Sequence, residues 1–174
     1  MSTADLTERM IQRGLISMFR TSSRVLMPNY TPRDWWECDL FRITKAGYFY
    51  EYEIKLTRGD FKADAKKVDI HYGPHGNGKW GKFVHSRKHE RLGQEGDDGP
   101  REFWWVVRED LIGLDDIEDW AGLMYARVSN PRYSTKWPRL RVVRHARRFK
   151  RQKMDAGAID RALTSAYYRY IYSL

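Results

Sequence analysis

The chain has 174 residues, and 32 Lys and Arg stand against 23 Asp and Glu, so its formal net charge is +9 at pH 7. A hydrophobic share of 41% and an aromatic share of 14% exclude a disordered chain and predict a single globular domain over residues 1–174. The only cysteine, Cys38, excludes an internal disulfide and indicates a reducing compartment such as a cytoplasm. No apolar run approaches the roughly 18 residues of a membrane span, so we expect no membrane partner and, from the charge, a polyanion such as nucleic acid.

The first third of the chain alternates between helix and strand patterns. Apolar residues at helical spacing predict an amphipathic helix, and β-branched and aromatic runs then predict three strands. These elements are expected over residues 5–20, 24–30, 35–43 and 48–56. Turn-forming residues 44–47 join the last two strands, which we expect to pair as an antiparallel hairpin.

A helix is predicted directly after the third strand. Thr57 and Asp60 have the spacing of a capping box, so the helix should begin just after Lys55. Its buried stripe is expected to contain Phe61, Ala65 and Val68.

The rest of the chain is less regular. Residues 71–100 are rich in Gly, His and charge and predict a loop around a short helical piece near 86–92. Further strands are expected over 103–107, 123–128 and 139–146, with an acidic turn or short helix through 111–120 and a closing helix over 155–172. The pattern predicts an α/β fold with a mixed central sheet flanked by helices.

Alternation along the hairpin brings charged residues together. Glu51, Glu53 and Lys55 share one face of their strand, because side chains point to opposite faces with period two. Asp39, on the preceding strand, can then lie alongside Glu53. Two neighbouring carboxylates repel unless a cation lies between them, and Mg²⁺ or Mn²⁺ suits oxygen ligands. Lys55 could position or help deprotonate an attacking water, or offset charge that develops on a phosphoryl oxygen.

Asp39, a turn, and then Glu53-Ile54-Lys55 followed by a helix resemble the D…(D/E)-x-K signature of the PD-(D/E)XK nuclease superfamily. The departure is Cys38, which stands where the signature has proline. The resemblance implies a restriction-endonuclease-like core in which Asp39, Glu53 and the carbonyl of Ile54 bind the metal and Lys55 is the catalytic lysine. Glu8 in the first helix would complete this site, or else is a solvated helix residue.

A closer likeness covers residues 35–128. EIKLTRGDFKADAKK, KHERL, GPREFWWVVREDLI and AGLMYA resemble a bacterial and phage branch of the superfamily that includes MmcB-like DNA-repair proteins. This likeness implies an enzyme that hydrolyses DNA phosphodiester bonds in the cytoplasm of a bacterium or of a phage-infected host.

DNA contacts are expected from basic groups near the metal site and in a second basic run. The candidates are Arg58, Lys62, Lys66, Lys67, Lys88, His89, Arg144, Arg147 and Arg148. A solvated charged face is the alternative for any one of them, and Lys88 and His89 could reach the active site instead.

Three alternatives stay open at this stage. Asp39, Glu53 and Lys55 could form a cross-strand salt-bridge ladder on an exposed sheet face. The domain could also be a catalytically inactive nucleic-acid-binding module, or an accessory protein that acts through protein partners. The sequence leaves the oligomeric state open between a monomer and a homodimer.

Overall fold

A computed structural model describes residues 6–64, 66, 68–74, 80–94, 96, 99–128 and 138–173. The elements in chain order are α1 (Glu8–Phe19), β1 (Ser23–Tyr30), β2 (Cys38–Thr44), β3 (Phe49–Lys55), α2 (Arg58–Asp64), β4 (Val68–Pro74), β5 (Trp80–Arg87), α3 (Lys88–Gly93), β6 (Glu102–Arg108), the 3₁₀ turn η1 (Leu114–Asp116), β7 (Gly122–Arg127), β8 (Arg139–Arg144) and α4 (Ala156–Ile171).

A six-stranded sheet in the order β1-β2-β3-β6-β7-β8 forms the centre of the fold. Neighbouring strands run antiparallel from β1 to β3, parallel from β3 through β6 to β7, and antiparallel again between β7 and β8. Strands β4 and β5 form a separate two-stranded ribbon. The predicted α/β fold with a mixed central sheet and flanking helices is therefore confirmed.

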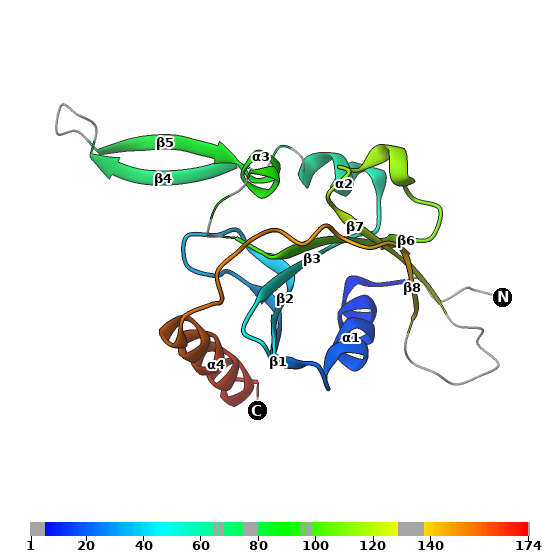
Figure 1. The fold of residues 1–174 in the computed structure, drawn as a ribbon, viewed down its shortest axis with the longest axis horizontal. Coiled ribbons are helices and arrows are strands. Elements are labelled where there is room, and N and C mark those ends of the chain that lie inside the picture. Colours follow the sequence, from blue (N-terminus) through cyan, green and yellow to red (C-terminus); the bar gives the residue numbers. More distant parts are fainter. Residues whose placement is uncertain are drawn as a thin grey trace.

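Helices cover both faces of this sheet (Figure 1). On one face, Ile11 and Leu15 of α1 pack against a cluster that includes Tyr52 and Ile54. On the other face, Ile159 and Ala162 of α4 pack against residues of β1, β2 and β3. Helices α2 and α3 lie over the β3-β6-β7 part of the sheet (Figure 1), and Leu92 of α3 belongs to the third apolar cluster there.

The β2-β3 hairpin has the register that the site requires. Leu40 pairs with Tyr52, and the strands continue antiparallel toward the turn. One step beyond that pair, Asp39 and Glu53 are neighbours on the face opposite α1. Gly47 in the turn has φ +91°, which a residue with a side chain rarely adopts.

The helix after β3 begins as predicted but ends earlier. The hydroxyl oxygen of Thr57 accepts a hydrogen bond from the backbone N–H of Asp60 at 3.1 Å. Phe61 packs edge-on against Trp105, with ring centroids 4.9 Å apart. The expected stripe through Val68 is wrong, because α2 ends at the buried Asp64 and Val68 begins β4. Ala65 lies outside the described residues.

The prediction of a loop over much of 71–100 is also wrong. Within it, β4 and β5 pair antiparallel, with Ile70 opposite Val84 and Tyr72 opposite Lys82. Backbone hydrogen bonds between the two segments stabilise strands there despite the glycines and histidines that favoured a loop. The short helix expected near 86–92 is confirmed as α3.

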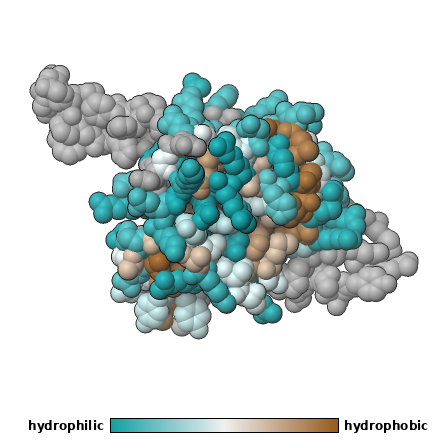
Figure 2. Space-filling model, in the orientation of Figure 1, coloured by the Kyte–Doolittle hydropathy of each residue, from teal (hydrophilic) through white to brown (hydrophobic). Residues whose placement is uncertain are grey.

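The surface is dominated by polar and charged groups. Figure 2 shows hydrophilic residues over most of the visible face, with smaller apolar patches between them. No helix in the described ranges is both long enough and apolar enough to cross a bilayer.

Candidate active site

The three residues of the predicted signature converge. The amino group of Lys55 lies 2.7 Å from Oε2 of Glu53 and 3.4 Å from Oδ2 of Asp39. The same Asp39 oxygen accepts the backbone N–H of Ile54 at 2.6 Å, which fixes the carboxylate against β3. Glu53 is fully buried, whereas the side chain of Asp39 is 19% exposed, so Asp39 forms the open edge of the cluster. Because these side chains are buried or nearly so, they do not form the alternative structure, a salt-bridge ladder on an exposed sheet face.

A second lysine lies behind the first. Lys88, the first residue of α3, is fully buried, and its amino group lies 2.6 Å from Oε1 of Glu53 and 2.6 Å from Oε1 of Glu51. The indole N–H of Trp35 donates to the other oxygen of Glu51 at 2.8 Å. Lys88 therefore lies in the charged cluster beside the signature residues, and its buried amino group does not face solvent.

A chain of polar contacts runs from Lys55 to the protein surface. The buried Asp64 places Oδ1 3.2 Å from the Lys55 amino group and Oδ2 2.9 Å from Nε2 of His89. Nδ1 of His89 lies 2.9 Å from Glu118, which accepts the indole N–H of Trp105 at 3.2 Å with its other oxygen. The imidazole also stacks on the Trp105 ring, with an interplanar angle of 13°. Contacts to Asp64 and Glu118 and stacking on Trp105 thus fix the orientation of the His89 imidazole.

The charges shift the ionisation of the cluster. Burial, and next the negative charge of Glu53, raise the pKa of Asp39 to about 7. Burial opposes the charged form of Lys55, but Glu53, Asp39 and Asp64 prevail and raise its pKa above the ordinary lysine value. For His89, burial is likewise outweighed, because hydrogen bonds to Asp64 and Glu118 raise its pKa to about 9. Both cations are therefore protonated at neutral pH.

Carboxylates outnumber cations in this cluster. Five carboxylates, Asp39, Glu51, Glu53, Asp64 and Glu118, meet the three cationic groups Lys55, Lys88 and His89. This excess of negative charge adds to burial, the larger cause, in raising the pKa of Asp39 to about 7. A divalent cation at this edge would compensate the same excess.

The donor set fits a hard divalent ion. Among the described residues, no three His, Cys, Asp or Glu side chains are arranged to hold a metal. Mg²⁺, however, is commonly bound through only one or two carboxylates, with waters completing its coordination. Asp39 and Glu53 supply two carboxylates. No described residue binds Oδ1 of Asp39, whereas the oxygens of Glu53 already pair with Lys55 and Lys88. The carbonyl of Ile54 faces the same neighbouring strand as its N–H, which binds Asp39.

Glu8 lies beside this edge and is linked to it through Gln12. The Gln12 amide nitrogen lies 2.8 Å from Oε1 of Glu8 and 2.9 Å from the carbonyl oxygen of Asp39. The negative charge of Glu8 is also among the causes that raise the pKa of Asp39. Glu8 is half-buried at this position, so it is a neighbour of the proposed ligands, with its carboxylate already bound to Gln12.

The residues predicted to contact nucleic acid differ in their exposure and in their partners. Arg58, Lys62 and Lys66 are exposed, and Lys67 lies outside the described residues. In the second basic run, Arg144 donates to the backbone oxygens of Ala121 and Glu118, Arg148 binds Glu102 at 2.9 Å, and Arg147 is exposed. His89 lies within the charged cluster, together with Lys88.

Sequence reasoning missed the roles of Asp64 and Glu118 and the burial of Lys88, whereas it left Glu51 open between a solvated and a supporting charge. The alternation along β3 placed Glu51 on the face of Glu53, which was the available signal for its position. No comparable signal existed for Lys88, because a lysine is almost never fully buried unless it is paired.

Comparisons with known proteins add information on the fold alone. No protein-family model matches the sequence, and no curated protein matches it. A solved structure of a protein of unknown function from Silicibacter pomeroyi is similar, with a TM-score of 0.59 and 17% sequence identity. The similarity covers 97% of this chain and 91% of that one. At this identity the likeness supports a shared fold.

Proposed function

We propose that the protein is a Mg²⁺- or Mn²⁺-dependent deoxyribonuclease of the PD-(D/E)XK type that acts in bacterial or phage DNA processing or repair. The observation that carries the proposal is the excess of carboxylates around Lys55, with Asp39 at the exposed edge. The order of β1, β2, β3 and β6 around the hairpin also suits the restriction-endonuclease-like core that the signature implies.

Asp39, Glu53 and the carbonyl of Ile54 would hold the ion. When bound, a divalent ion makes a coordinated water more acidic and neutralises charge on phosphoryl oxygens. Glu53 is held by Lys88 as well as by Lys55, so its carboxylate is fixed in position before any ligand arrives. Such preorganisation reduces the reorganisation needed when charge develops.

Lys55 is suited to electrostatic stabilisation. Its raised pKa keeps the amino group protonated, so it cannot accept a proton from water in this state. A protonated amine beside Asp39 can donate a hydrogen bond to a phosphoryl oxygen whose negative charge increases during hydrolysis. Of the roles considered for Lys55, offsetting phosphoryl charge is therefore the one that its environment favours.

An inactive nucleic-acid-binding module is the second candidate. It is favoured by the two buried lysines, because Lys55 and Lys88 already neutralise much of the carboxylate charge. Such a module would bind DNA through its exposed basic residues and would show no metal-dependent cleavage.

The deciding experiment incubates the protein with linear, circular and branched DNA in Mg²⁺, Mn²⁺ or EDTA. Asp39→Asn and Lys55→Met should each reduce metal-dependent cleavage about 100-fold or more. Lys45→Ala, which removes an exposed positive charge from the turn between β2 and β3, is the matched control and should retain most of the activity. Cleavage that survives both active-site substitutions would exclude these residues from the mechanism.

A further inference from the structure

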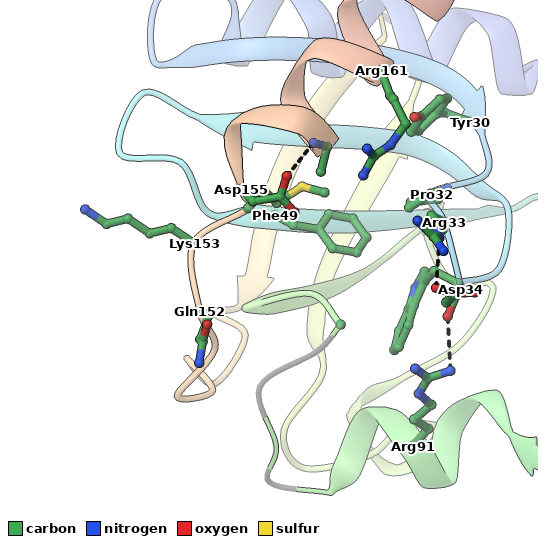
Figure 3. A pocket seen from close by; sticks show the side chains of 14 residues that line it. Tyr30, Pro32, Arg33, Asp34, Phe49, Arg91, Gln152, Lys153, Asp155 and Arg161 are labelled. Carbon is green, nitrogen blue, oxygen red and sulfur yellow. Dashed lines mark hydrogen bonds and ion pairs between the residues drawn. The ribbon is translucent and has the colours of Figure 1, made fainter.

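A pocket lies on the other side of Trp35 from the charged cluster. Its volume is about 630 Å³, and it is bounded by the start of α4, by the segment that follows β1 and by residues 152–155 (Figure 3). Trp35 belongs to both sites, because its ring lines the pocket while its N–H donates to Glu51. The pocket is therefore one side chain away from the carboxylate that pairs with Lys88.

The aromatic wall of this pocket is held rigidly. The Arg91 guanidinium lies 4.8 Å from the centroid of the Trp35 ring, and Phe49 meets the ring edge-on at 6.3 Å. Gly99, which also lines the pocket, has φ +92°, and a Cβ there would lie 2.7 Å from the Trp35 ring. Together with the hydrogen bond to Glu51, these contacts fix the indole in place. The aromatic wall is thus preformed.

Positive charge predominates among the described residues that line the pocket. Within that part of the chain, the charged lining residues are the basic Arg33, Arg91, Lys153 and Arg161 and the acidic Asp34 and Asp155. Asp155 caps α4 by accepting the N–H of Ala158 at 2.7 Å, and Asp34 pairs with Arg33 at 3.4 Å. No described residue forms an ion pair with Arg161. Figure 3 shows the Arg161 side chain reaching down from α4 toward the side that carries Arg33.

We propose that this pocket binds the terminal phosphomonoester nucleotide of a nucleic-acid strand. An aromatic wall suits a base, and guanidinium groups bind phosphate oxygens through paired hydrogen bonds. A terminal phosphate carries about −1.5 to −2 charges near neutral pH, in contrast to the single charge of an internal phosphodiester. Among the described lining residues, basic groups outnumber acidic ones, which suits the more negative terminal form.

This inference rests on the proposed function, in which the substrate is a nucleic acid. It adds the kind of strand that would bind, namely one that ends in a phosphate. Trp35 connects the pocket to the charged cluster, because its ring lines the pocket and its N–H donates to Glu51. The protein would therefore select strands by their ends, and either a 5′- or a 3′-phosphate supplies the required chemistry.

Binding without metal tests the inference apart from cleavage. Oligonucleotides labelled internally and ending in a 5′-phosphate, a 3′-phosphate or only hydroxyls are titrated by fluorescence anisotropy in EDTA. We expect one phosphorylated form to bind about tenfold more tightly than the hydroxyl form. Thymidine monophosphate carrying the phosphate at the same position should compete for the site.

Arg161→Ala and Arg33→Ala should each reduce the preference toward equal affinity. The control Arg139→Ala removes an exposed positive charge from β8, at the opposite edge of the sheet, and should leave the preference unchanged. Equal binding of all three oligonucleotides by the unmodified protein would overturn the inference, even if the protein cleaves DNA. A preference that Arg161→Ala and Arg33→Ala abolish supports it, even if no cleavage is detected.

Discussion

Lys88 and Glu53 are 35 positions apart in the sequence, yet the Lys88 amino group lies 2.6 Å from a carboxylate oxygen of Glu53, and both side chains are fully buried. The contact joins α3 to β3. The contact therefore fixes α3 against Glu53, one of the residues of the D…(D/E)-x-K signature.

Replacing Lys88 with methionine should destabilise the protein strongly. The substitution conserves much of the side-chain volume but leaves Glu51 and Glu53 without their shared cation. Breaking a buried ion pair by removing one partner typically costs about 3–5 kcal/mol. Urea denaturation measures the loss, and Lys62→Met on the exposed face of α2 should change stability by less than about 0.5 kcal/mol. A loss below 1 kcal/mol for Lys88→Met would mean that the pair contributes little.

Asp39→Asn should stabilise the metal-free protein at alkaline pH while it removes activity. The pKa of Asp39 is about 7 in the folded protein, above the 3.8 of an unburied aspartate. Because the folded state holds this proton more tightly, protonation of Asp39 adds to the free energy of unfolding. That stabilisation is fully present below pH 3.8 and is lost as pH rises through 7. Asparagine avoids that loss, so we expect a gain of about 1–3 kcal/mol at pH 8 and little change at pH 4. Denaturation at both pH values in EDTA tests this, and a loss at pH 8 would contradict it.

The His89 interactions should stabilise the protein in a defined pH range. Because the folded pKa of about 9 exceeds the ordinary 6.5, the contribution is fully present below pH 6.5 and disappears as pH rises through 9. His89→Gln should cost about 2–3 kcal/mol at pH 6, and the difference from the unmodified protein should shrink by pH 9.5. His145→Gln, at an exposed histidine, provides the control. A difference that stays constant with pH would exclude a charged His89.

Metal affinity should depend on pH through Asp39. At pH 6 most Asp39 side chains with a pKa near 7 are protonated, and a proton must leave before the carboxylate can bind an ion. Isothermal titration with Mg²⁺ or Mn²⁺ should therefore give about tenfold weaker binding at pH 6 than at pH 8. Asp39→Asn should abolish both the binding and its pH dependence. Affinity that is unchanged between the two pH values would place the ion elsewhere.

The sequence predicted the centre of the site because that centre depends on local geometry. Two-residue alternation along β3 and a short turn are enough to bring Asp39 beside Glu53 and Lys55. The same rules explain why Tyr52 and Ile54 face α1.

The surroundings of the site could not be predicted in this way. Lys88 and His89 follow the β4-β5 ribbon in the sequence, so their position at the cluster depends on how that ribbon pairs. Pairing between those strands is not encoded by local propensity alone. Asp64 ends α2 in a buried position, which a helical pattern with solvated charges does not indicate.

The parallel pairing of β3 with β6 has a consequence for folding. The connection over residues 56–101 leaves the sheet at the end of β3 and must return to the opposite end of the sheet, where β3 begins, before β6 can pair, and α3 is part of this connection. Closing so long a loop is slow compared with forming the β2-β3 hairpin. During synthesis, Asp39, Glu51, Glu53 and Lys55 thus emerge before Lys88, so the three carboxylates at first have one of these two cations beside them. Packing of α3 then adds the Lys88 amino group to Glu51 and Glu53.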